Sequence, residues 1–215
     1  QIHLSETDKE VNDSLEKYGK TPVELLDSIN FLDDSTTLAH CVKLKEQDYQ
    51  IIRDRKSTIV TNVASNAKLG NGIAPVTKMI SEGINVAIGT DGVSSNNTLN
   101  MFREMGLLSL MHKAHNNDTL ALGAQEVLKM ATINGAKALK MEDKLGIIKE
   151  GALADLIFLD LNAPSLFPNN NIISSLVYSA NGSEVESVMV NGEFVMRDKK
   201  ILTFDTKDVQ NKVRN

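Results

Sequence analysis

The sequence predicts an α/β fold that consists of half a (β/α)8 barrel followed by a smaller antiparallel β unit. Four short, β-prone and mostly apolar segments alternate with helical patterns as far as residue 115. Strands that are apolar almost throughout indicate parallel pairing with helices on both faces of the sheet. A closed barrel of this type contains eight such units, so four units predict about half of one.

The four expected strands are short, and each is followed by a helical pattern; they cover residues 2–4, 36–42, 57–63 and 85–89. After the first strand, apolar residues recur at helical spacing until Gly19, which predicts the end of that helix. Thr21 followed by Pro22 predicts the start of the next helix, because threonine caps helices and proline fits their first position. The longest helical pattern covers residues 99–115.

The chain changes character after two further helical stretches. Residues 152–161 alternate as a strand does, and Asn191-Gly192 between two β-prone runs is a strong hairpin signal. We therefore predict two units: a barrel-like unit at residues 1–148, and an antiparallel β unit with a C-terminal tail at residues 149–215.

The composition excludes two classes of partner. The 215 residues include 23 Lys plus Arg, which are dispersed, against 28 Asp plus Glu, and the net charge is −5. Binding to nucleic acid through its phosphates needs a basic patch, so no nucleic acid is expected as a partner. No stretch approaches the roughly 20 apolar residues that span a bilayer, so no membrane is expected either. The single cysteine, Cys41, fits a reducing, cytoplasmic compartment and is expected to pack in the core.

Three metal-capable residues stand at or just beyond the carboxyl ends of expected strands. His3 ends the first strand, His40 lies near the end of the second, and Asp91 follows the fourth. In a parallel barrel these ends converge on one mouth, so the three side chains are expected to be neighbours. Imidazole and carboxylate together are the ligand set of a catalytic divalent ion such as Zn²⁺. The alternative is that each histidine is a core or strand-end residue.

Other polar residues have competing interpretations. The Glu6 carboxylate, three residues after His3, could reach a metal-bound water, or it could be an acidic residue that the dipole favours at a helix N-terminus. His112 and His115 fall on the last turn of a helix, where the dipole favours histidine, and we leave them out of the site. Three polar residues near the strand ends stay unassigned: Ser65, Asn96 and Asn97.

Several longer motifs carry a family resemblance. They are IHLSET at 2–7, LAHCV at 38–42, ASNAKLGNGIAPV at 64–76, GTDGVSSNNTLNMFREM at 89–105, GALADLIFLDL at 151–161 and VMVNGEFV at 188–195. With these motifs the chain resembles the metal-dependent amidohydrolase superfamily, in particular the deaminases of methylthioadenosine and S-adenosylhomocysteine and their chlorohydrolase-like relatives. The resemblance covers nearly the whole chain.

The resemblance implies a role for each candidate residue. It makes His3 a metal ligand from the fifth barrel strand and Glu6 a proton shuttle. It makes His40, on the sixth strand, a polar group beside the metal-bound water or substrate. It makes Asp91, on the eighth strand, a ligand that also accepts a proton from that water. The implied cofactor is one divalent ion, with zinc as the default and iron as the alternative. The implied fold is the C-terminal half of a barrel, about strands 5–8, with part of a small β-sandwich.

One departure from the family pattern bears on the extent of the chain. The first-strand His-x-His pair, which supplies two further metal ligands in that family, is absent here. We therefore expect the chain to be the C-terminal half of a longer enzyme and to be inactive alone. The implied reaction is hydrolytic deamination of a purine-type or related heterocyclic amine through a metal-activated water. Methylthioadenosine and S-adenosylhomocysteine are the expected kind of substrate.

Two alternatives stay open at this point. Another amidohydrolase reaction would use the same metal site, for example chlorohydrolase, guanine deaminase or cytosine deaminase chemistry. Outside enzymes, the chain could be a catalytically silent metal-binding or interaction module. Homo-oligomer formation is likewise left open by the sequence.

Overall fold

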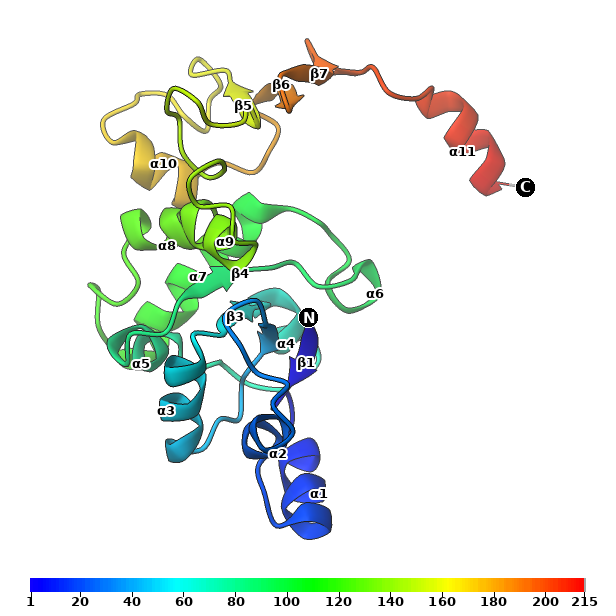
Figure 1. Ribbon diagram of the computed structural model, residues 1–215. Coiled ribbons are helices and arrows are strands. Elements are labelled where there is room, and N and C mark those ends of the chain that lie inside the picture. Colours follow the sequence, from blue (N-terminus) through cyan, green and yellow to red (C-terminus); the bar gives the residue numbers. More distant parts are fainter. Residues whose placement is uncertain (215) are drawn as a thin grey trace.

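The computed structural model describes residues 1–214 and contains two four-stranded sheets (Figure 1). The first sheet is parallel, with its strands in chain order: β1 (Ile2–Leu4), β2 (Thr37–His40), β3 (Thr58–Thr61) and β4 (Val86–Ile88). The second is antiparallel, also in chain order: β5 (Leu156–Leu159), β6 (Val185–Val190), β7 (Glu193–Arg197) and β8 (Lys200–Ile201). The predicted α/β class and the change from parallel to antiparallel pairing are confirmed.

Helices connect the parallel strands, link the first sheet to the second, lie between β5 and β6, and end the described part of the chain. They are α1 (Asp8–Tyr18), α2 (Pro22–Ser28), α3 (Glu46–Arg55), α4 (Val63–Lys68), α5 (Val76–Ser81), α6 (Val93–Asn96), α7 (Met101–Asn116), α8 (Ala124–Met130), α9 (Ile133–Ala138), α10 (Ile172–Tyr178) and α11 (Thr206–Arg214). In Figure 1 the terminal helix α11 lies apart from the rest of the chain, and none of its residues is buried. Among residues 1–214, no helix has the length and apolar character that crossing a membrane requires.

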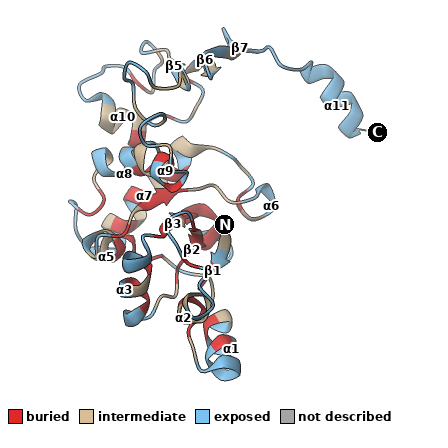
Figure 2. Cartoon of the chain, viewed as in Figure 1, coloured by how far each residue is buried: buried red, intermediate tan, exposed pale blue. Residues whose placement is uncertain are grey.

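The parallel sheet forms the centre of the main hydrophobic core. Leu38, Ile59 and Val86, from three neighbouring strands, are at most 1% exposed. They belong to one apolar cluster with helix residues such as Ile52 of α3 and Met79 of α5. Figure 2 shows buried residues on the strands and on the helix faces turned toward them, with exposed residues outside. Because the strands are parallel and in chain order, their carboxyl ends reach the same edge of this packed layer.

Local signals in the sequence fix several element boundaries. Gly19 has a left-handed φ of +65° and ends α1, and Thr21 and Glu24 form a capping box that begins α2. Asn191 and Gly192, with φ values of +50° and +84°, connect β6 and β7 in the predicted hairpin. These predicted turns and caps are confirmed.

Strand β2 is shorter than predicted, and the reason lies in its backbone. The chain leaves the strand at His40, because His40 and Cys41 adopt left-handed φ values of +72° and +50°. The Cys41 N–H then donates to Leu4 O of the neighbouring strand at 3.0 Å. The Cys41 side chain is fully buried in the core, as predicted, and burial raises the pKa of its thiol far above the ordinary range.

The second sheet also differs from the prediction in its first strand. Only residues 156–159 of the expected strand at 152–161 pair with β6. Before them the Leu153 N–H donates to Lys144 O at 2.9 Å, and after them the Ala163 N–H closes a turn onto Asp160 O at 3.3 Å. Helices α10 and α11 have no counterpart among the predicted elements. Asn171 begins α10 by accepting a hydrogen bond from the Ser174 N–H at 3.0 Å.

Candidate metal centre

Two adjacent strands and the loop after β4 bring three metal-capable side chains together. In the register of β1 and β2, His3 stands opposite Ala39 and Leu4 opposite His40. The two imidazole rings lie edge to face, with centroids 4.8 Å apart. One ligand atom of each of His3, His40 and Asp91 lies within 4.8 Å of the other two. The structure therefore brings together the three residues that the sequence singled out.

Unusual backbone conformations turn these side chains into the same region. His40 has a φ of +72° and Asp91 a φ of +60°, both in the left-handed region that non-glycine residues seldom occupy. Such conformations are disfavoured by roughly 1 kcal/mol or more each and persist only where the surroundings enforce them. The chain leaves β2 at His40 and turns at Asp91 in the loop after β4, whereas His3 lies within β1.

The surroundings of His40 leave one ring nitrogen free for a ligand. The His40 side chain is buried, and its Nδ1 lies 2.8 Å from Asn66 Oδ1. In the tautomer that donates from Nδ1 to this amide oxygen, Nε2 keeps its lone pair; the other contact of Nδ1, with Asn62 Nδ2, is longer at 3.5 Å. Within residues 1–214, Nε2 is buried and has no hydrogen-bond partner. A bound cation, a water molecule or a donor group of the substrate would supply the partner that this buried lone pair lacks.

Asp91 is held as a carboxylate by hydroxyl groups from two short helices, α4 and α6. Its Oδ2 accepts from Ser65 Oγ at 2.6 Å and from Ser95 Oγ at 2.7 Å. Burial works against ionisation, but the hydrogen bonds from Ser65, Ser95 and the Gly92 backbone, together with nearby His40, lower the pKa of Asp91 to about 2. The group is therefore ionised at neutral pH, which suits a metal ligand.

Glu6 is held beside this cluster rather than at the start of a helix. Its Oε1 accepts from Asn71 Nδ2 at 2.7 Å, and its Oε2 lies 3.7 Å from His40 Nε2. Helix α1 begins only at Asp8, and it is Glu10 whose carboxylate accepts from the Glu6 backbone N–H at 2.7 Å. The geometry favours the interpretation of Glu6 as a site residue over that of a helix-terminal charge.

The two histidines of α7 lie outside the cluster, as predicted, but the reason for His112 is different. His112 is 1% exposed, and burial, with a smaller effect of nearby His115, lowers its pKa to about 4. The His112 side chain is therefore neutral at pH 7. Attraction between a protonated imidazole and the helix dipole then does not explain why a histidine stands at this position. Packing in the core explains it, while His115 is exposed.

Several residues that contact His40, Asp91 or Glu6 were not assigned to the site from the sequence. They are Ser65, Asn66 and Ser95, which contact the candidate ligands, and Asn71, which contacts Glu6. Ser65 and Asn66 are buried although they are polar, and both lie in the helix that follows β3. Polar residues directly after a parallel strand were the only available hint. Of the other unassigned residues, Asn96 is buried and Asn97 contacts Lys68 on the surface.

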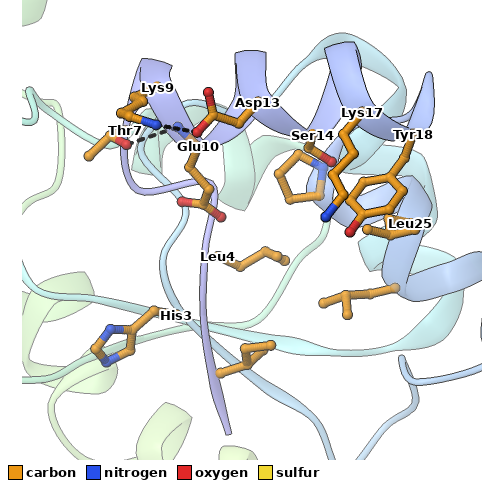
Figure 3. Close-up of a pocket in the computed structure, with 13 residues that line it drawn as sticks. His3, Leu4, Thr7, Lys9, Glu10, Asp13, Ser14, Lys17, Tyr18 and Leu25 are labelled. Atoms are coloured by element: carbon orange, nitrogen blue, oxygen red, sulfur yellow. Dashed lines mark hydrogen bonds and ion pairs between the residues drawn. The ribbon is translucent and has the colours of Figure 1, made fainter.

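Two cavities border β1. One of about 370 Å³ is lined by His3, Asn62 and Asp91, and by the loop at residues 89–92. The other, of about 640 Å³, lies between β1 and helices α1 and α2. In Figure 3, Leu4 points toward those helices and His3 points to the opposite side of the strand. The smaller cavity is therefore the one that both His3 and Asp91 line.

Comparison with known proteins identifies the class of the chain. Residues 1–195 match the amidohydrolase family, so the chain belongs to that family. A curated protein from Thermococcus sibiricus named 5-methylthioadenosine/S-adenosylhomocysteine deaminase is 55% identical over 196 residues, 91% of this chain and 46% of that protein. Its namesake from Caldanaerobacter subterraneus is 49% identical over 208 residues, 97% of this chain and 48% of that protein. The chain thus spans about half the length of the curated relatives it matches.

Solved structures of the same fold lead to the same class. An adenosine deaminase from Xanthomonas campestris with bound zinc superposes with a TM-score of 0.95 at 34% identity, covering 99% of this chain and 48% of that one. An atrazine chlorohydrolase from Arthrobacter aurescens complexed with zinc gives a TM-score of 0.87 at 26% identity, covering 99% of this chain and 47% of that one. Amidohydrolases with different substrates therefore share this arrangement of elements.

Proposed function

We propose that this chain is the C-terminal half of a metal-dependent aminohydrolase that deaminates an adenosine-type nucleoside such as methylthioadenosine or S-adenosylhomocysteine. The observation that carries the proposal is the convergence of His3, His40 and Asp91, whose ligand atoms lie within 4.8 Å of one another. Relatives named for this activity are 46–55% identical over most of the chain, which supports the substrate class.

The proposed architecture follows from the order of the strands. Strands β1–β4 correspond to strands 5–8 of a (β/α)8 barrel within residues 1–148, and residues 149–215 contribute to a β-sandwich. The sequential parallel order of the four strands supports this assignment, as does a chain that spans about half of its relatives. The preceding half would supply the His-x-His pair that this chain lacks.

The residues present fit a divalent cation. His3 and Asp91 would hold it, with His40 beside it, and the ionised Asp91 and the unpartnered, buried Nε2 of His40 support this fit. Zinc is the default for this ligand set, and iron is the alternative. When bound, such an ion would lower the pKa of a coordinated water to near 7.

The chain's own residues would then manage protons and orientation. As a water molecule bonds to the amine-bearing carbon, Glu6, fixed by Asn71, can take a proton from it on Oε2 and deliver that proton to the departing amine, which leaves as ammonia when the C–N bond breaks. His40, held by Asn66 through Nδ1, presents Nε2 to the substrate side of the site. With a pKa of about 2, Asp91 serves better as a ligand than as the main proton carrier, so Glu6 is assigned that role.

The test uses the complete protein that contains this chain. We expect Asp91→Asn and His3→Asn each to lower bound metal well below one ion per chain and to reduce methylthioadenosine deamination at least about 100-fold. Removing metal with a chelator should abolish turnover of the parent protein, and added Zn²⁺ should restore it. Normal metal content together with normal turnover in Asp91→Asn would refute the proposal.

A second reaction is favoured by one observation, the likeness to an atrazine chlorohydrolase at a TM-score of 0.87. The same metal site serves dechlorination and deamination, so the residues of this half do not discriminate between them. A substrate panel does: methylthioadenosine, S-adenosylhomocysteine, 5′-deoxyadenosine, guanine, cytosine and a chlorotriazine. If only the chlorotriazine is turned over, the proposed function becomes that of a chlorohydrolase and not that of a deaminase.

A further inference from the structure

A fully buried carboxylate outside the candidate ligand set lies between two parts of the site. Glu104 of α7 is 0% exposed. Its Oε2 accepts from the Ala64 N–H at 3.2 Å, and its Oε1 accepts from Asn96 Nδ2 at 2.8 Å. A buried carboxylate is unfavourable unless it is hydrogen-bonded, so these two contacts account for its presence.

The first contact supports the helix that holds His40 and Asp91. Helix α4 has Asn62 at its N-cap, but the Asn62 side chain makes no cap hydrogen bond and instead lies 3.5 Å from His40 Nδ1. Glu104 supplies the missing acceptor at the N-terminus of α4, from 40 positions away in the chain. The next two residues of α4 are Ser65 and Asn66, which contact Asp91 and His40.

The second contact supports the loop that carries Asp91. The Asn96 amide donates to Thr90 O at 2.6 Å as well as to Glu104, and its Oδ1 accepts from Arg103 Nη1 at 2.9 Å. Thr90 directly precedes Asp91, whose left-handed backbone must be enforced by its surroundings. Asn96 itself is 2% exposed, so these hydrogen bonds are shielded from bulk water.

We propose that Glu104 is a positioning residue for the metal centre, an inference that rests on the proposed function. Its carboxylate ties together the helix that orients His40 and the loop that orients Asp91. Both partners of Glu104 are donors, so the position requires two acceptor oxygens. A glutamine of the same size would direct its NH₂ group at one of those donors, and a shorter aspartate would reach only part of the way.

The chain offers a matched control for a purely structural role. Glu184 is also 0% exposed, and its carboxylate accepts from the Gly182 N–H at 2.9 Å, from the Asn181 N–H at 3.2 Å and from Ser165 Oγ. It supports the turn before β6, and none of these three partners contacts His3, His40 or Asp91 in the hydrogen bonds described. Its substitution therefore reports loss of a buried carboxylate whose partners do not touch the candidate ligands; its one link toward Glu104 is the Asn181 carbonyl, which accepts from Asn100 Nδ2 at the N-cap of α7 at 2.7 Å.

The experiment compares Glu104→Gln with Glu184→Gln, and Glu104→Asp with Glu184→Asp, in the complete protein. The measurements are urea unfolding of the metal-free form, Zn²⁺ affinity by competition with a chelator, the visible spectrum of the Co²⁺ form, and kcat and KM. We expect all four variants to lose stability. Only the Glu104 variants should bind Zn²⁺ about tenfold or more weakly, change the Co²⁺ spectrum and lower kcat more than they raise KM.

The outcomes are distinct. Glu104 variants that bind Zn²⁺ and Co²⁺ as the parent does, while losing only the stability that their Glu184 counterparts lose, would overturn the inference. If Glu104→Gln does not fold, Glu104→Asp decides by the same criterion. A parent protein that binds no divalent metal would instead refute the proposed function on which the inference rests.

Discussion

The buried His112 predicts a specific loss of stability in acid. Both ring nitrogens of His112 are buried without a hydrogen-bond partner among the described residues, and burial lowers the pKa to about 4 from the ordinary 6.5. The unfolded chain takes up a proton on this histidine below about pH 6.5, whereas the folded chain does so only near pH 4. Stability is therefore unaffected above pH 6.5 and falls as the pH drops through this interval.

The magnitude follows from the width of that interval. Each pH unit corresponds to about 1.4 kcal/mol for one proton, so the fall from 6.5 to about 4 predicts a loss of about 3 kcal/mol. The variant His112→Leu has a similar volume and no titrating group. We expect it to be at least as stable as the parent at pH 7, because two unpaired buried nitrogens are removed.

The assay is equilibrium urea unfolding of metal-free protein at several pH values between about 7 and 4. The difference in unfolding free energy between His112→Leu and the parent should grow by about 3 kcal/mol over that range. His115→Gln is the control, because His115 is only the second cause of the shift and its removal should preserve most of the pH dependence. A difference that stays constant from pH 7 to pH 4 would refute the reasoning.

Three further predictions concern the site and the extent of the chain. In Gly89→Ala the new Cβ would stand 2.6 Å from Asn62 Oδ1, so we expect the free energy of unfolding in urea to fall by about 1–3 kcal/mol and the activity to be weaker. The control is Gly135→Ala, where nothing lies within 4 Å of the new Cβ, and this variant should be as stable as the parent or more stable. Asn71→Ala should free Glu6 and lower kcat about tenfold or more with a smaller change in KM, and an unchanged kcat would remove Glu6 from proton transfer. The 215 residues alone should show no deamination, and robust turnover by this chain would contradict the proposed division into two halves.

The sequence predicted features that depend on neighbouring residues or on strand order. The capping box at Thr21 and the turn at Asn191-Gly192 are local and were predictable from residue type. His3, His40 and Asp91 were predictable as neighbours because parallel strands end at a common edge, whatever the details of packing.

The residues that orient the candidate ligands were not predictable in the same way. Asn71 lies 65 positions from Glu6, and Glu104 lies 40 positions from Ala64. Such pairs depend on how helices pack over the sheet, which no local pattern encodes. His112 illustrates the same point. Its position near a helix end predicted an interaction with the helix dipole, but the side chain is buried, and no local pattern predicted that.

The left-handed backbone at His40 affects how its function can be measured. An alanine at position 40 would remove the imidazole and also place a residue with no preference for φ near +72° where the turn after β2 demands it. Any lost activity would then mix chemistry with misfolding of that turn. Asparagine tolerates this conformation far better, so comparing His40→Asn with His40→Ala separates the contribution of the ring from that of the chain path.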